Sequence, residues 1–143
     1  MIVAVHALTG GALSRLCRTP TQAFLVGALS HLVADALPHR DLGIMEETLL
    51  LMATLSVVTA TQGAHSREFA GALGAAAPDI ENLIARALRI PDDRLLLPTH
   101  RRYHGREVPS LRGQIALALG CLAVIVAPGL LRGAAARQRG NYT

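Results

Sequence analysis

Long apolar stretches alternate with short polar breaks along the chain, and two of these stretches occupy its first half. The first runs from Ala23 to Leu37 and should end at Pro38, because the residue before a proline avoids the helical conformation. The second covers Glu46 to Gln62 and carries no charge from Thr48 onwards. The pattern predicts two apolar helices joined by a polar turn.

The second half of the chain predicts two more helices around a polar section. Residues 67–90 begin with small side chains that permit close helix packing and continue, after a proline step at Pro78, as an amphipathic helix. Residues 91–112 are rich in arginine and predict a loop with at most short helices. Residues 113–131 are uncharged and would extend about 28 Å as a helix, against a hydrocarbon core of about 30 Å. We expect a membrane span there, with a packed soluble helix as the alternative.

These elements predict an all-α fold, a compact and membrane-associated bundle of about five helices with one C-terminal transmembrane helix. We divide the chain into a helical domain at residues 1–112, a transmembrane or buried apolar helix at residues 113–132 and a basic tail at residues 133–143. The first residues lack the basic start and cleavage pattern of a secretory signal, so we expect them to stay on the chain.

Composition supports the membrane and removes several classes of function. The chain of 143 residues is 51% hydrophobic and 17% charged, which favours a membrane-associated helical protein. All 14 basic residues are arginine, so phosphate-loop and Schiff-base lysine chemistry is excluded. The net charge of +4 would attract nucleic acid, but two Phe, two Tyr and no Trp provide few aromatic side chains for bases to stack on. We therefore expect the chain to bind no nucleic acid. Cys17 and Cys121 lack ligand spacing and are interpreted as core residues.

One apolar helix contains a histidine and an aspartate four residues apart. His31 and Asp35 therefore project from the same face and can supply two ligands to one metal ion. An aspartate in an apolar helix costs about 2.5 to 3.5 kcal/mol at a bilayer centre, so something should offset that cost. His39 and Asp41 follow just past the helix end. The alternative is that Asp35 bonds an arginine while His31 is a satisfied core histidine.

Other segments bring the same two side-chain types. His6 lies near the start of the chain, Asp79 follows Pro78, and His100 and His104 are four residues apart. Imidazole and carboxylate suit zinc, and a set without thiolate fits a catalytic site better than a structural one. Two alternatives stay open: Pro78 and Asp79 also fit an ordinary helix start, and the late histidines also fit a solvated loop.

Taken in order, the motifs "HALTGG", "GALSHLVADALPHRD", "GALGAAAPDIENL" and "PTHRRYHG" resemble those of the membrane-bound metal-dependent hydrolase family, uncharacterised bacterial proteins related to zinc-dependent phospholipase C. The resemblance covers most of residues 5–105, although "PDIEN" and "YHG" depart from the usual continuations. It implies a metal site formed at the matching positions, which are His6, His31, Asp35, Asp79 and His100.

The resulting hypothesis is a metal-dependent hydrolase in a bacterial cell membrane. A divalent metal, zinc by the donor set, would activate water against a phosphate ester or related bond in a small-molecule or lipid-like substrate. The full set of expected metal ligands is His6, His31, Asp35, His39, Asp79, His100 and His104. Asp41 or Glu81 would act as general base. Arg101 and Arg102 would bind phosphate oxygens or meet the head groups of membrane lipid.

Two hypotheses of other classes compete with hydrolysis. The chain would serve as a non-catalytic metal-binding membrane protein if the metal had no open coordination position. It would be a helical structural protein if its histidines and aspartates formed only a buried hydrogen-bond and ion-pair network.

Overall fold

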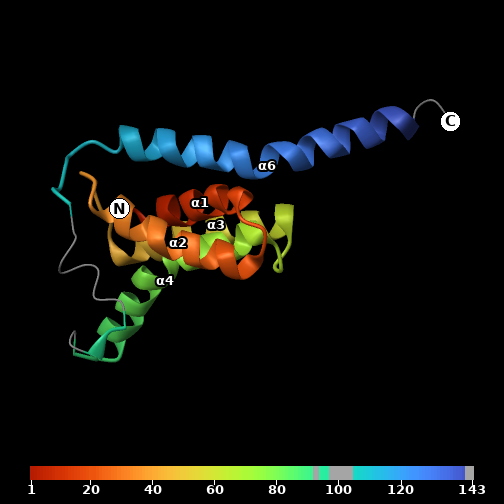
Figure 1. Ribbon diagram of the computed structural model, residues 1–143. Helices are drawn as coiled ribbons and strands as arrows, with labels where there is room; N and C mark the ends of the chain where they lie inside the picture. Colours follow the sequence, from red (N-terminus) through yellow and green to blue (C-terminus); the bar gives the residue numbers. More distant parts are fainter. Residues whose placement is uncertain (92–93, 97–104, 141–143) are drawn as a thin grey trace.

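The computed structural model describes residues 1–91, 94–96 and 105–140, and within these ranges the chain is helical and contains no strand. The elements are α1 (Val3–Leu13), a 3₁₀ turn η1 (Ser14–Leu16), α2 (Pro20–Asp35), α3 (Ile44–Gln62), α4 (Arg67–Ala87) and α6 (Arg112–Gly140). The predicted all-α fold with about five helices is confirmed. Figure 1 shows the helices side by side, with the ends of α4 and α6 projecting beyond the others.

The central element is α1, which is apolar on nearly every side. A helix that is apolar all round is stable when other elements bury it. Accordingly, α1 contacts α2, α3, α4 and α6. Its side chains from Val3 to Leu8 are all buried. His6 lies within this run, so the fold places an imidazole at the middle of the bundle.

Side chains from distant helices cap the first turn of α1. Ile2 is the N-cap residue, and its apolar side chain forms no capping hydrogen bond. Instead, the backbone N–H of Val3 donates to Oε2 of Glu47 on α3 at 2.8 Å, and that of Ile2 donates to Oε1 of Gln114 on α6 at 3.0 Å. The second carboxylate oxygen of Glu47 accepts from the N–H of Leu42 at 2.9 Å. These bonds satisfy donors that a helix start leaves unpaired and fix α1 in place.

Glycines bring α1 and α2 into backbone contact with α4. A Cβ atom on Gly10 or on Gly27 would overlap the carbonyl oxygen of Gly71, and one on Gly74 would overlap that of Phe24. Only residues without a side chain permit such an approach between helices. The close contact carries His6, His31 and Asp79 towards one another.

The proline step expected at Pro78 does not interrupt the helix. The α4 helix is continuous from Arg67 to Ala87, with Pro78 inside it and fully buried. Three alanines directly precede the proline and favour a helix up to it, so the segment does not need a new start. Asp79 therefore lies within a helix and not at its first turn.

The expectation of a C-terminal transmembrane helix is wrong in its location, because the described apolar helix long enough to span a membrane is α3. In the described residues, α3 is the one helix long and apolar enough to cross a membrane, with 19 residues, and in α3 only Val58 is buried. The apolar part of α6 described in the structure, Arg112–Ala127, is shorter than a bilayer span. The backbone of α6 continues as a helix to Gly140, past the boundary predicted at residue 132.

Candidate metal centre

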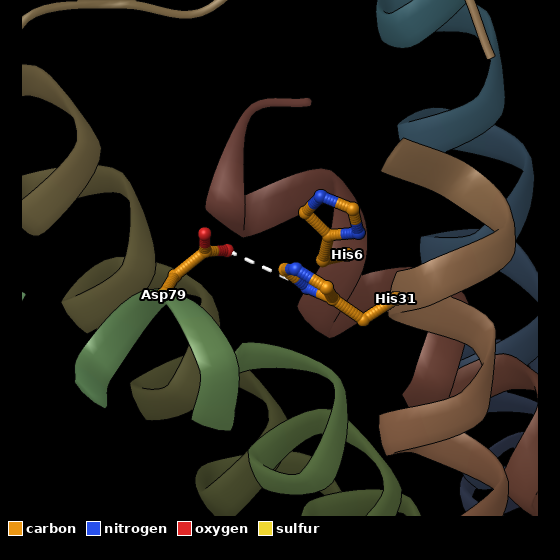
Figure 2. A group of neighbouring side chains, drawn as sticks. All are labelled: His6, His31 and Asp79. Carbon is orange, nitrogen blue, oxygen red and sulfur yellow. Dashed lines mark ion pairs between the residues drawn. The ribbon is translucent and has the colours of Figure 1, made fainter. Parts of the chain in front are cut away.

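Three helices bring two histidines and two aspartates together at the middle of the bundle. His6 comes from α1, His31 and Asp35 from α2, and Asp79 from α4. The side chains of His6, His31 and Asp35 are buried. Figure 2 shows the two imidazole rings beside each other and Asp79 directed towards His31 from α4. One potential ligand atom from each of His6, His31 and Asp79 lies within 4.8 Å of the other two, so the group could hold a metal ion.

Asp35 lies between the two histidines. Its Oδ1 is 3.0 Å from Nε2 of His6 and its Oδ2 is 3.2 Å from Nε2 of His31, which confirms that His31 and Asp35 share one face of α2. The amino group of Met1 is also 3.0 Å from Oδ1. Burial raises the pKa of Asp35, but the hydrogen bonds to both histidines and the nearby ammonium outweigh it and hold that pKa well below its usual range. Asp35 is therefore a carboxylate at neutral pH.

The protonation of His6 follows from its burial. Burial lowers the pKa of His6, and the hydrogen bond to Asp35 opposes this only in part, so the imidazole is neutral at pH 7. Nε2 donates to the Asp35 carboxylate, which leaves a lone pair on Nδ1. Nδ1 is buried and has no hydrogen-bond partner among the described residues. A buried, unsatisfied nitrogen lone pair of this kind is suited to a metal ion.

The tautomer of His31 is set by the backbone of α4. Its Nδ1 lies 2.9 Å from the carbonyl oxygen of Ala75, and because a carbonyl only accepts, Nδ1 carries the proton. Its Nε2 faces Oδ2 of the Asp35 carboxylate at 3.2 Å. The rings of His6 and His31 are stacked with centroids 4.0 Å apart.

A second group lies at the end of α2. His39 is buried, its Nδ1 is 2.7 Å from the carbonyl oxygen of Leu37, and its Nε2 is 3.4 Å from Oδ1 of Asp41. The Met1 amino group is 3.0 Å from the same Asp41 oxygen and so connects this group to Asp35. The backbone N–H of Gly105 donates to the carbonyl oxygen of Asp35 at 2.6 Å. Residues 105–108 therefore pack against the end of α2, beside His39.

The remaining predicted site residues are Glu81 and four residues of the arginine-rich section. His100, Arg101, Arg102 and His104 fall outside the residues that the structure describes. Glu81 is two residues beyond Asp79, about 200° around the helix, and its Oε1 accepts a hydrogen bond from the backbone N–H of Leu96 at 2.6 Å. It is not one of the three grouped ligands.

A cavity of about 220 Å³ adjoins the centre. Asp79 lines it and also belongs to the group of potential metal ligands. The other lining residues come from the N-terminal segment, the α2–α3 connection, α3 and α4: Met1, Val3, Asp41, Leu42, Ile44, Glu47, Thr48, Leu51, Met52, Ile80, Asn82 and Leu83. Asp41 reaches both this cavity and His39, and it is the less buried member of that pair. The arrangement joins a possible cation site to an apolar space.

Sequence patterns did not reveal three contributors to this site. The Ala75 carbonyl fixes His31, the Met1 amine contacts Asp35, and Glu47 holds the start of α1. Two of these groups belong to the backbone, which carries no signal in the side-chain pattern. Glu47 had the signature of an ordinary acid in the first turn of a helix.

Comparison of the chain with protein-family models, curated proteins and solved structures finds no match. Its function is therefore argued from the geometry of the site.

Proposed function

We propose that this protein is a divalent-metal-dependent hydrolase of membranes, with His6, His31 and Asp79 as metal ligands. The observation that carries the proposal is the buried Nδ1 of His6, which has a lone pair and no partner among the described residues. The donors are two imidazoles and one carboxylate without thiolate, and zinc accepts this set while keeping a position open for water.

Asp35 supports the metal assignment because it contacts the two histidines proposed as ligands. A carboxylate that accepts the N–H of a ligating histidine orients the ring and raises its basicity, and Asp35 contacts both rings.

Hydrolysis is favoured because the site adjoins the cavity through Asp79. When bound, a zinc ion supplies a Lewis acid that lowers the pKa of water and polarises an ester. Of the two residues considered as general base, Asp41 lines the cavity, whereas Glu81 does not. We assign Asp41 the role of accepting a proton from water in the cavity.

The surface of the bundle supports a membrane location. Large apolar side chains are exposed along the middle of α2 and α3, including Leu25, Leu29, Leu49 and Leu50. Neither α2 nor α3 has a charged side chain on this outer surface between its first turn and its last. An outer face this apolar matches hydrocarbon better than water.

Hydrolysis by detergent-purified protein tests the proposal. Carboxylic and phosphate esters with a chromogenic leaving group are offered to zinc-loaded and chelator-treated protein. We expect turnover that chelation abolishes, that His31→Gln reduces at least 100-fold and that His65→Gln, at an exposed turn, leaves unchanged. Zinc-loaded, folded protein that hydrolyses no member of the series would contradict the hydrolase and leave a metal-binding protein.

A further inference from the structure

The cavity beside the metal centre has an apolar wall and an exposed apolar mouth. Its wall contains Leu42, Leu51 and Ile80, which are partly buried. At its mouth, Ile44 is 58% exposed and Met52 is 62% exposed. These two side chains lie on α3, the helix with the composition of a membrane span. The mouth is therefore continuous with the surface that faces hydrocarbon in the proposed membrane location.

Four polar residues of the cavity lie on α3 and α4, and Asp41 lies on the connection that precedes α3. Asp79 and Asn82 are three residues apart on α4 and so project from one face. Glu47 and Thr48 lie in the first turns of α3, where Glu47 already accepts two backbone N–H groups. Leu51 and Met52 follow one turn later. Along α3 the polar lining residues Glu47 and Thr48 therefore lie between the apolar Ile44 at the helix start and the apolar Leu51 and Met52 one turn later.

The charges of the lining restrict the molecule that fits. Asp41, Glu47 and Asp79 contribute carboxylates, and the described lining contains no basic side chain. The Met1 ammonium, on another lining residue, is already paired with Asp35 and Asp41, so the three carboxylates disfavour an anionic group in the cavity. An uncharged hydrocarbon chain is compatible with the apolar wall, and burying it there gains about fourfold in binding for each methylene group.

We propose that this cavity binds the hydrocarbon chain of an uncharged, single-chain lipid ester, which enters from the bilayer between α3 and α4 and presents its ester to Asp79. The assignment of the ester rests on the proposed function, whereas the assignment of the chain rests on the cavity alone. The substrate class is accordingly a monoacylglycerol-like amphiphile.

Photocrosslinking tests the chain independently of turnover. A monoacylglycerol with a diazirine at the end of its acyl chain is added to metal-free and to zinc-loaded protein in detergent, and crosslinked residues are mapped by mass spectrometry. We expect crosslinks at Leu51, Met52 or Ile80 in both preparations. Leu83→Trp narrows the mouth from α4 and should reduce them at least fivefold. Leu119→Trp adds the same side chain to an exposed site on α6 and should not.

Met52→Trp narrows the same mouth from α3 and is a second blocking variant should Leu83→Trp fail to fold. Crosslinks confined to the outer faces of α2 and α6, or cavity crosslinks that a folded blocking variant leaves unchanged, would overturn the inference. Cavity crosslinks in a protein that hydrolyses no ester would support the chain site and overturn only the proposed hydrolase. Hydrolysis of short esters without cavity crosslinks would support the proposed hydrolase and overturn the chain site.

Discussion

Replacing Gly27 by alanine should destabilise the bundle, because the new methyl group has no space. The Cβ atom would overlap the carbonyl oxygen of Gly71 and approach the backbone nitrogen of Ala75. Both obstacles are backbone atoms of α4, so relief requires that α2 and α4 separate. Overpacking of this kind costs about 1 to 3 kcal/mol, and we expect the upper half of that range because no side chain can rotate away.

The same substitution should also weaken the metal centre. His31 lies one turn after Gly27 on the same face of α2, and its hydrogen bond to the Ala75 carbonyl spans the interface that would open. A separation of about 1 Å exceeds what a 2.9 Å hydrogen bond tolerates. Loss of this bond frees the ring of His31 to rotate, and zinc affinity should fall at least tenfold.

Thermal unfolding in detergent, followed by far-ultraviolet circular dichroism, measures the effect. A loss of 2 to 3 kcal/mol corresponds to a decrease in Tm of about 5 to 10 °C for a chain of this size. Gly120→Ala is the matched control, since Gly120 lies in α6 and a Cβ there meets nothing within 4 Å. Helix propensity should make that variant slightly more stable. The reasoning is refuted if Gly27→Ala unfolds at or above the wild-type temperature.

Three further predictions concern the cap, the histidine and the metal. Glu47→Ala removes the acceptor for the N–H groups of Val3 and Leu42, so the free energy of unfolding measured with a chemical denaturant should fall by about 1 to 3 kcal/mol. The control Glu46→Ala, at an exposed neighbouring position, should lower it by less than about 0.5 kcal/mol. Equal losses would argue against the cap. In metal-free protein, the lowered pKa of His6 means that its imidazole takes up a proton only in the unfolded chain, so the free energy of unfolding should decrease by up to about 1.4 kcal/mol per pH unit below pH 6.5. His6→Gln should flatten that slope. An unchanged slope would contradict a neutral buried His6. Adding zinc at about 100 times its Kd should raise the stability by about 2.7 kcal/mol and chelator should reverse it, and a Tm insensitive to both would argue against binding to the folded state.

The hydropathy pattern predicts α2, α3, α4 and the first part of α6 because their boundaries are marked locally, but no helix was predicted at α1 (Val3–Leu13). Thr19 precedes Pro20 at the start of α2, and its side chain accepts a hydrogen bond from the N–H of Gln22. The shared face of His31 and Asp35 follows from helical spacing alone. Local signals of this kind need no knowledge of the neighbouring helices.

The position of the apolar helix of span length could not be predicted in the same way. Residues 48–62 and 113–131 are both uncharged, and the choice between them depends on helix length and on which side chains other helices cover. The continuity of α4 through Pro78 likewise depends on the helix that precedes the proline. These properties arise from tertiary packing, which a hydropathy pattern does not contain.

The candidate site was predictable in its side chains and not in its backbone partners. His6, His31 and Asp79 were chosen by residue type, spacing and resemblance, and the packing of α1 and α2 on α4 brings them together. The Ala75 carbonyl, which fixes the proton on His31, leaves no trace in the sequence because every residue has one.

Metal content measured by inductively coupled plasma mass spectrometry tests the central claim most directly. Wild-type protein is purified in detergent, supplied with zinc, freed of unbound metal and compared with His6→Ala, Asp79→Asn and the control His65→Ala. The account predicts near-stoichiometric zinc in wild type and His65→Ala, and its loss from the other two variants while they remain helical. Well-folded wild-type protein without bound metal, or variants at His6 and Asp79 that retain it, would contradict a metal centre shared by α1, α2 and α4.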